Sequence, residues 1–147
     1  MLNSIIDLFE RDLQKLEKEI LAFQNEKKLW IIEKQISNTA GNLALHLCGN
    51  LQHFIGALLG KSGYIRNREK EFNDKNIKRE KLIEEIQNTQ NIVSKVLSNL
   101  THDTVLKKYP QQVLGFEMTT EYFLIHLYGH LNYHLGQINY HRRLLDV

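Results

Sequence analysis

The sequence has few of the residues that interrupt helices or form cross-links. It contains one cysteine, one proline and eight glycines among 147 residues. A lone cysteine excludes an intrachain disulfide and indicates a reducing compartment, and so little proline and glycine argues against a many-stranded β fold. No segment approaches the roughly 18 consecutive apolar residues of a membrane span, and the first residues lack the basic start and apolar run of a signal peptide. We therefore expect a helical, cytoplasmic protein with no membrane partner.

The sequence also lacks an excess of charge of one sign. Its 19 basic and 17 acidic residues give a formal net charge of +2. The most basic stretch, residues 61–81, also contains acidic residues throughout, namely Glu69, Glu71, Asp74 and Glu80. Such mixing is typical of a solvated surface rather than of a phosphate-binding patch. We therefore expect no nucleic-acid partner.

Four segments have apolar residues spaced three or four apart, which is the pattern of amphipathic helices. They cover residues 3–27, 38–59, 78–100 and 120–145. Ser37 is a suitable N-cap for the second segment, and Thr119 or Thr120 for the fourth. The connections over residues 60–77 and 101–118 are long, and the second, with Tyr109-Pro110, has room for a short extended pair. The pattern predicts a single all-α domain over residues 1–147, a four-helix bundle with long connections between helices 2 and 3 and between helices 3 and 4.

Histidine is abundant, with seven residues, and most histidines lie in two of the predicted helices. The second helix contains His46 and His53, and the fourth contains His126, His130, His134 and His141. Residues four apart share a helix face, so the pairs 126/130 and 130/134 could each bind one divalent ion together with a histidine of the second helix. His130 and His134 continue the inward apolar stripe of their helix, which favours them, although spacing leaves the choice open. Histidines that only pack and hydrogen-bond at the core boundary are the alternative.

Three segments resemble a known family. Residues 129–138 (GHLNYHLGQI) resemble the terminal-helix signature of the DinB-like (YfiT-like) superfamily, in which two histidines four apart precede a small residue, glutamine and isoleucine. Residues 42–51 (NLALHLCGNL) resemble its second-helix motif, and residues 64–72 (YIRNREKEF) look like the arginine-rich stretch of an uncharacterised branch. The resemblance covers essentially the whole chain and is strongest at the two histidine motifs.

The resemblance implies a fold, a ligand set and a chemistry. The fold would be a four-helix bundle, commonly a homodimer, and the metal ligands would be His46, His130 and His134. The remaining candidates would lie outside the ligand set: His53, His102, His126 and His141. Characterised relatives include bacillithiol S-transferases and mycothiol-dependent isomerases, so the resemblance implies a thiolate activated at a three-histidine metal and an electrophile as its partner. Zinc, nickel, copper and iron(II) all suit imidazole ligands, so the metal is not identified.

Several residues near the histidines have two interpretations each. Gln137 and Asn50 lie about one turn from His134 and His46, where each could orient a ligand or simply be a buried polar group. Gly129 and Gly136 each cost a helix about 1 kcal/mol relative to alanine, which predicts that a ligand or a neighbouring helix approaches closely. Cys48 is expected to be a small core residue rather than a ligand.

The sequence identifies no general base beside the predicted ligands. Arg66 and Arg68 could hold an anionic cofactor or substrate, or could pair with Glu69 and Glu71 in a solvated loop. The first functional hypothesis is a divalent-metal-binding protein that acts as a metal-dependent transferase with a low-molecular-weight thiol, or as a hydrolase. The second is a non-catalytic metal-binding or dimeric interaction module. The third is a bundle whose histidines bind no metal.

Overall fold

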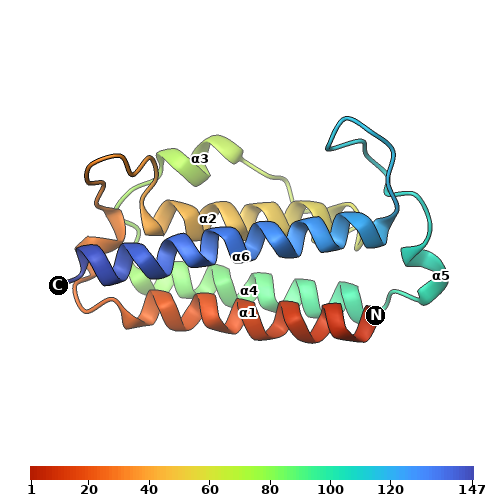
Figure 1. Ribbon diagram of the computed structural model, residues 1–147, viewed down its shortest axis with the longest axis horizontal. Helices are drawn as coiled ribbons and strands as arrows, with labels where there is room; N and C mark the ends of the chain where they lie inside the picture. Colours follow the sequence, from red (N-terminus) through yellow and green to blue (C-terminus); the bar gives the residue numbers. More distant parts are fainter.

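A computed structural model describes residues 1–147, and it is helical with no sheet. Its elements are α1 (Leu2–Ala22), the 3-10 turn η1 (Glu26–Trp30), α2 (Ala40–Leu51), the π-helical turn η2 (Gln52–Ala57), α3 (Arg68–Asn73), α4 (Arg79–Ser98), α5 (His102–Val105) and α6 (Thr120–Leu145). Four long helices, with η2 continuing α2, lie side by side, and α3 and α5 lie outside them (Figure 1). No helix combines the length and hydropathy needed to cross a bilayer.

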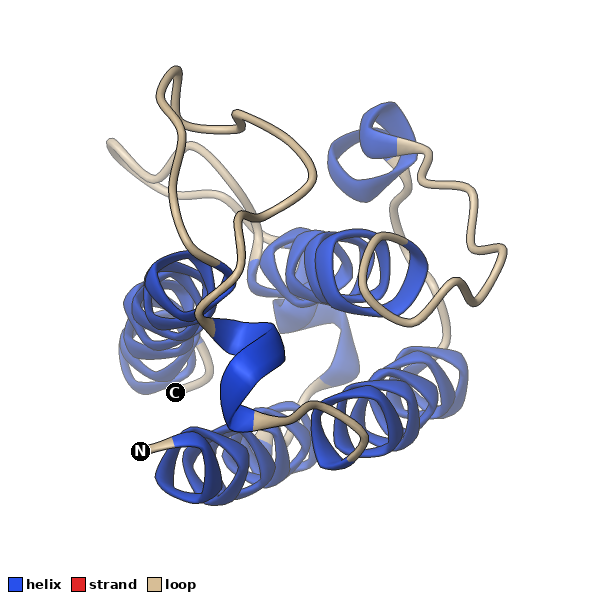
Figure 2. Ribbon diagram, turned by 90° about the vertical axis from the view of Figure 1, so that its right-hand side faces the viewer, coloured by secondary structure: helices blue, strands red, loops and turns tan.

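The four long helices surround one apolar core. Helix α1 packs against α4 and α6, and α2 packs against the same two helices, so α1 and α2 lie diagonally across the arrangement (Figure 2). Each helix contributes the apolar residues that recur every three or four positions. The buried side chains include Phe9, Leu13 and Leu16 of α1, Leu47 and Leu51 of α2, Leu82 and Ile86 of α4, and Phe123, Leu127 and Leu131 of α6.

The predicted helix boundaries are correct for the fourth segment and approximate for the others. Helix α6 covers the predicted 120–145, and Thr119 caps it by accepting a hydrogen bond from Tyr122 N. Helix α1 ends at Ala22 rather than at residue 27, because Phe23 is extended. The backbone N–H groups of Gln24 and Asn25 instead donate to the Asp146 carboxylate, at 2.6 and 3.0 Å.

The start of α2 and its cap differ from the prediction. The cap is Thr39, not Ser37: the Thr39 hydroxyl accepts from Asn42 N at 3.0 Å and donates to Asn42 Oδ1 at 2.6 Å. Thr39 is fully buried whereas Ser37 is exposed, so the buried hydroxyl satisfies the helix end. The π-helical turn near the other end gives this helix a wider turn at His53 and Phe54.

Both long connections contain structure. Residues 60–77 include the short helix α3, which packs on α2; this helix was not predicted. Residues 101–118 contain α5, and in place of the predicted extended pair there is one isolated antiparallel bridge, between Lys108 and Thr119. Tyr109, just before the proline, anchors this loop by donating its hydroxyl proton to Phe54 O at 2.7 Å.

Candidate metal centre

Three histidines from two helices, α2 and α6, meet where these helices pack together. They are His46, from the middle of α2, and His130 and His134, one turn apart on α6. The Nε2 atom of His130 lies 3.1 Å from Nε2 of His46 and 3.1 Å from Nε2 of His134. His46 is 7% exposed and the other two are half-buried. The trio expected from the family resemblance is therefore brought together, and its nitrogens could hold a metal ion.

The two separations from His130 Nε2 match those of ligands around one ion. Two imidazole nitrogens that each lie about 2.1 Å from a divalent ion, at angles of roughly 90–110°, are about 3.0–3.4 Å apart. The 3.1 Å separations fall within that range. Ring planes at 79–89° to one another let each Nε2 approach the common point from a different direction.

The hydrogen bonds at Nδ1 of His46 and His134 determine which nitrogen of each ring carries the lone pair. Nδ1 of His46 lies 2.9 Å from Glu71 Oε1, and Nδ1 of His134 lies 2.7 Å from Gln137 Oε1. Both partners are oxygen acceptors, so each Nδ1 carries the proton. In the neutral rings, Nε2 of both His46 and His134 then directs a lone pair at His130. One N–H of His130 can satisfy only one of them, whereas a cation would satisfy all three.

The environment favours neutral rings, which are the form that binds metal. Burial, and then the neighbouring His134 and His46, lower the pKa of His130 to about 3. Burial also lowers the pKa of His134, although its hydrogen bond with Gln137 acts in the opposite direction. Both rings are therefore neutral at physiological pH.

A buried carboxylate positions His46. Glu71, on α3, is 6% exposed and accepts hydrogen bonds from His46 Nδ1 and from Arg66. Arg66 binds it with two parallel bonds, Nε to Oε2 and Nη2 to Oε1, both 2.9 Å. Burial acts to raise the pKa of Glu71, but the hydrogen bonds from His46 and Arg66 outweigh it, and the pKa lies below its usual value. The site thus contains a carboxylate–histidine pair of the kind that orients metal ligands.

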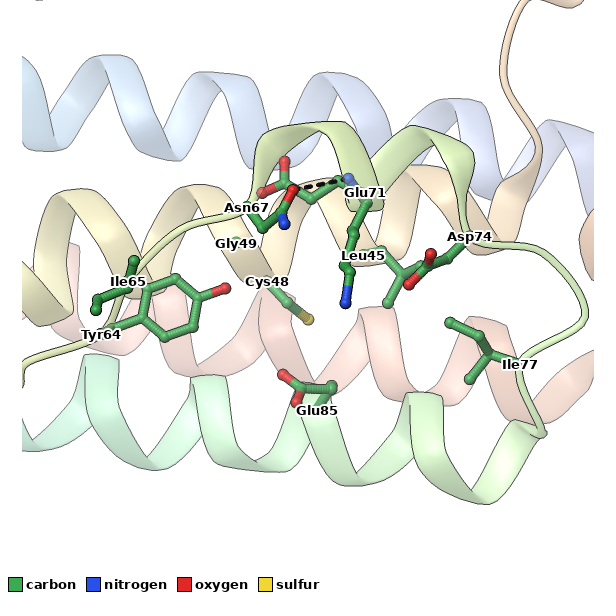
Figure 3. Close-up of a pocket in the computed structure, with 11 residues that line it drawn as sticks. Leu45, Cys48, Gly49, Tyr64, Ile65, Asn67, Glu71, Asp74, Ile77 and Glu85 are labelled. Atoms are coloured by element: carbon green, nitrogen blue, oxygen red, sulfur yellow. Dashed lines mark hydrogen bonds between the residues drawn. The ribbon is translucent and has the colours of Figure 1, made fainter.

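Helix α3 places Glu71 through contacts with α2. Asn42 of α2 donates from Nδ2 to the carbonyl oxygens of Glu71 and Asp74, both at 2.8 Å. Glu71 reaches across α2 above Gly49 (Figure 3), where a Cβ atom would lie only 1.9 Å from Glu71 Oε2. Phe72 packs on the His46 ring with centroids 4.9 Å apart. Glycine at position 49 is therefore required for the carboxylate to approach His46.

Of the other residues that the sequence singled out, some contact the three histidines and some do not. Gln137 contacts His134 as the sequence suggested, whereas Asn50 is buried and its Oδ1 has no partner. Cys48 is buried, which raises the pKa of its thiol to about 12 and confirms it as a core residue. Arg68 lies over the Phe72 ring, while the half-buried Arg66 pairs with Glu71.

The remaining histidines do not join the three-histidine group. His126 is exposed and stacks on Phe123, and His53 lies against Phe54. His141 is 8% exposed, and its Nδ1 has no hydrogen-bond partner. His102 is the first residue of α5, which lies at one end of the four long helices (Figure 1).

The prediction for Gly129 and Gly136 is wrong within this chain. Both glycines are exposed, and a Cβ atom at either position would meet nothing within 4 Å. They lie on the solvent face of α6, so no helix or side chain of the same molecule approaches them. The glycine that a close approach does require is Gly49.

The comparison with curated proteins found no match. A family model covers residues 1–146 of the 147. The chain therefore belongs to the family DUF1572, described as a protein family of unknown function.

Proposed function

We propose that this protein is a DinB-like four-helix bundle that holds a divalent metal ion on His46, His130 and His134 and uses it in catalysis. The observation that carries the proposal is the convergence of three Nε2 atoms, two of them with their Nδ1 protons bound by Glu71 and Gln137. The arrangement of four long helices, with ligands from α2 and α6, supports the family resemblance.

The donor set favours a catalytic centre over a closed structural one. Three protein ligands leave a coordination position for water or substrate, whereas structural sites usually have four. When bound, a divalent ion on neutral imidazoles lowers the pKa of a thiol or water molecule beside it. The proposed reaction is therefore transfer of a low-molecular-weight thiol to an electrophile, or hydrolysis. Zinc, nickel or iron(II) would suit the ligands.

The surrounding residues would keep the ligands in place. Glu71 holds the proton on His46 Nδ1, so that Nε2 remains free to coordinate, and Gln137 does the same for His134. Arg66 balances the charge of Glu71. These are positioning roles, and no side chain is assigned as a general base.

Metal content tests the proposal. We expect tag-free protein to contain near-stoichiometric zinc, nickel or iron by elemental analysis. The double variant His130→Ala/His134→Ala should contain almost none. His126→Ala is the matched control, because it removes an exposed histidine from the same helix and should leave the metal content unchanged. A parent protein that takes up no zinc, nickel, manganese or iron(II) would rule out the metal centre.

Activity is tested separately on the metal-loaded protein. Consumption of small thiols with 1-chloro-2,4-dinitrobenzene can be followed by absorbance, and hydrolysis with chromogenic esters and amides. The proposal predicts turnover that the double variant lacks. A protein that binds metal but turns over neither class would instead be a metal-binding module.

A second candidate, a dimeric interaction module, is favoured by the solvent face of α6. Five large apolar or aromatic residues on this helix are 50–66% exposed: Tyr122, Ile125, Tyr133, Tyr140 and Leu144. The open Gly129 and Gly136 lie on the same helix. We propose that a second copy packs here. Light scattering should then detect a dimer in the parent and a monomer in Tyr133→Glu/Tyr140→Glu, and a monomeric parent would refute it.

A further inference from the structure

A cavity of about 420 Å³ lies beside His134, one member of the three-histidine group. One wall is the loop of residues 35–38 before α2, and the other is the C-terminal half of α6. His134 forms part of the α6 wall and His141, two turns further along, forms another part. The volume is within the range of small-molecule sites, roughly 300–1,000 Å³. A molecule in this cavity would therefore contact a predicted metal ligand directly.

The lining of this cavity differs from that of the others. The lining has no aspartate, glutamate, lysine or arginine; its polar groups are amides, hydroxyls and two imidazoles, and Leu43 and Ile36 supply apolar surface. Four other cavities, of about 260–430 Å³, each include aspartate, glutamate or lysine. An ionic ligand would find no counter-charge in this lining, whereas the amides, hydroxyls and imidazoles offer hydrogen bonds to an uncharged polar ligand.

His141 lines this cavity, and one of its imidazole nitrogens has no hydrogen-bond partner within the chain. The residue is 8% exposed, yet its Nδ1 has no hydrogen-bond partner. Buried polar groups are nearly always paired, so an exception needs an explanation. Burial also lowers the pKa of His141, which keeps the ring neutral at physiological pH. Its neighbour Gln137 uses Oε1 on His134, which leaves amide N–H groups to donate to an occupant.

We propose that this cavity binds the substrate of the metal centre, and that the part of the substrate inside it is uncharged and rich in hydrogen-bonding groups, as in an amide or an alcohol. The occupant would contact His141 at one end and reach the side of His134 at the other. This inference rests on the proposed function, because it takes His134 to be a metal ligand. It adds the class of substrate and the direction of approach.

Three probes of one shape and different charge test the assignment. Benzamide is neutral, benzoate is an anion and benzamidine is a cation. Each is titrated into the zinc-loaded and the zinc-free protein while backbone and imidazole NMR signals are recorded. We expect benzamide to shift the signals of residues 35–38, Tyr133, Gln137 and His141. In the zinc-free protein, where benzoate has no ion to bind, both ionic probes should shift these signals at least roughly tenfold more weakly at equal concentration.

The variant His141→Leu tests the role of the imidazole. Leucine is of similar size and removes both imidazole nitrogens, so the protein should fold and keep its zinc. Benzamide should then bind roughly fivefold more weakly, the value of about one neutral hydrogen bond. His126→Leu is the matched control, since His126 is exposed on the same helix and outside the cavity, and it should bind benzamide like the parent.

Failure of this inference can be told apart from failure of the proposed function, because zinc content is measured on the same samples. Zinc uptake with no benzamide shifts at these residues overturns the cavity assignment and leaves the metal centre standing. Equal or tighter binding of benzoate or benzamidine in the zinc-free protein overturns the uncharged class. Benzamide binding in a protein that takes up no zinc refutes the metal centre and with it the link between cavity and metal.

Discussion

Replacing Glu71 with glutamine should weaken metal binding without removing any ligand. Glutamine has the same size but no charge, and it offers one oxygen where the carboxylate offers two. In the parent those two oxygens accept from His46 Nδ1 at 2.9 Å and from Arg66 Nε and Nη2, both at 2.9 Å. The amide group must turn an N–H towards either His46 or Arg66, so at least one donor loses its acceptor.

Two magnitudes follow from this geometry. Removing the hydrogen-bonded partner of a metal-binding histidine typically costs 10- to 100-fold in metal affinity, so we expect a loss of roughly that size for zinc. The free energy of unfolding of the metal-free protein should fall by about 1.5–3 kcal/mol, the value of a hydrogen bond to a charged group. The Arg66 and Glu71 side chains are only 13% and 6% exposed, so solvent cannot replace the lost contact.

Competition with a zinc-binding dye at pH 7.5 measures the affinity, and urea denaturation of the same samples measures stability. Glu69→Gln is the matched control, because Glu69 is exposed on the same short helix and forms no hydrogen bond with the three histidines. It should bind zinc like the parent. If Glu71→Gln is fully folded and binds zinc as tightly as Glu69→Gln, Glu71 does not position His46 for the metal.

Three further changes test other parts of the site and of α6. Gly49→Ala places a Cβ atom 1.9 Å from Glu71 Oε2. We expect the zinc affinity to fall roughly as far as in Glu71→Gln. An unchanged zinc affinity in the dye competition would contradict this. The pKa of His130 is about 3 in the folded chain and about 6.5 in the unfolded chain, so only the unfolded chain binds this proton between those values. The free energy of unfolding of the metal-free protein should therefore fall as the pH falls from 6.5 towards 3. It should fall less in His130→Asn, as measured by urea denaturation at pH 7.5 and pH 5. An equal loss of stability in the parent and in His130→Asn would refute this assignment. Gly136→Ala should raise the free energy of unfolding by about 1 kcal/mol in dilute monomer, whereas a loss in urea denaturation would show that another molecule packs against this glycine.

The long helices could be predicted because their signal is local. Apolar residues every three or four positions recur through α1, α4 and α6, and those residues form the core. The end of α1 could not be predicted, because Phe23 continues the apolar spacing of Ile20. The helix stops where Gln24 and Asn25 donate to Asp146, more than 120 residues away. A contact between residues so far apart in the sequence cannot be read from a local pattern of apolar residues.

The ligand trio was predicted only with help from the resemblance. Spacing alone left open the pair of His126 and His130 as well as His130 and His134, and either His46 or His53. The structure separates them: His126 is exposed, and His53 lies against Phe54 within the π-helical turn. Neither property follows from a spacing of four residues.

The pairing of Arg66 with Glu71 was among the predictions, but the bond between Glu71 and His46 was missed because it depends on tertiary contacts. The sequence around Glu71 shows only alternating charges, and a six-residue helix has little intrinsic stability. Two features would have indicated it: Asn67 as a cap, which accepts from Lys70 N at 3.2 Å, and the glycine at position 49 within a helix. Neither identifies the partner of His46 until α3 is placed against α2.

The charges around the trio lead to one further conclusion about its chemistry. Glu71 is the acidic residue bonded to a ligand histidine, and the two bonds from Arg66 offset its charge. Gln137, which supports His134, is uncharged, and Cys48 is buried in the core with a raised pKa. The chain therefore supplies three neutral ligands and surrounds them with groups whose charges cancel. An ion held there would keep its full charge for the molecule that completes its coordination, which is the condition that lowers the pKa of a bound thiol or water. A structural site with thiolate ligands would instead neutralise that charge, so this donor set suits the proposed catalysis better than a purely structural role.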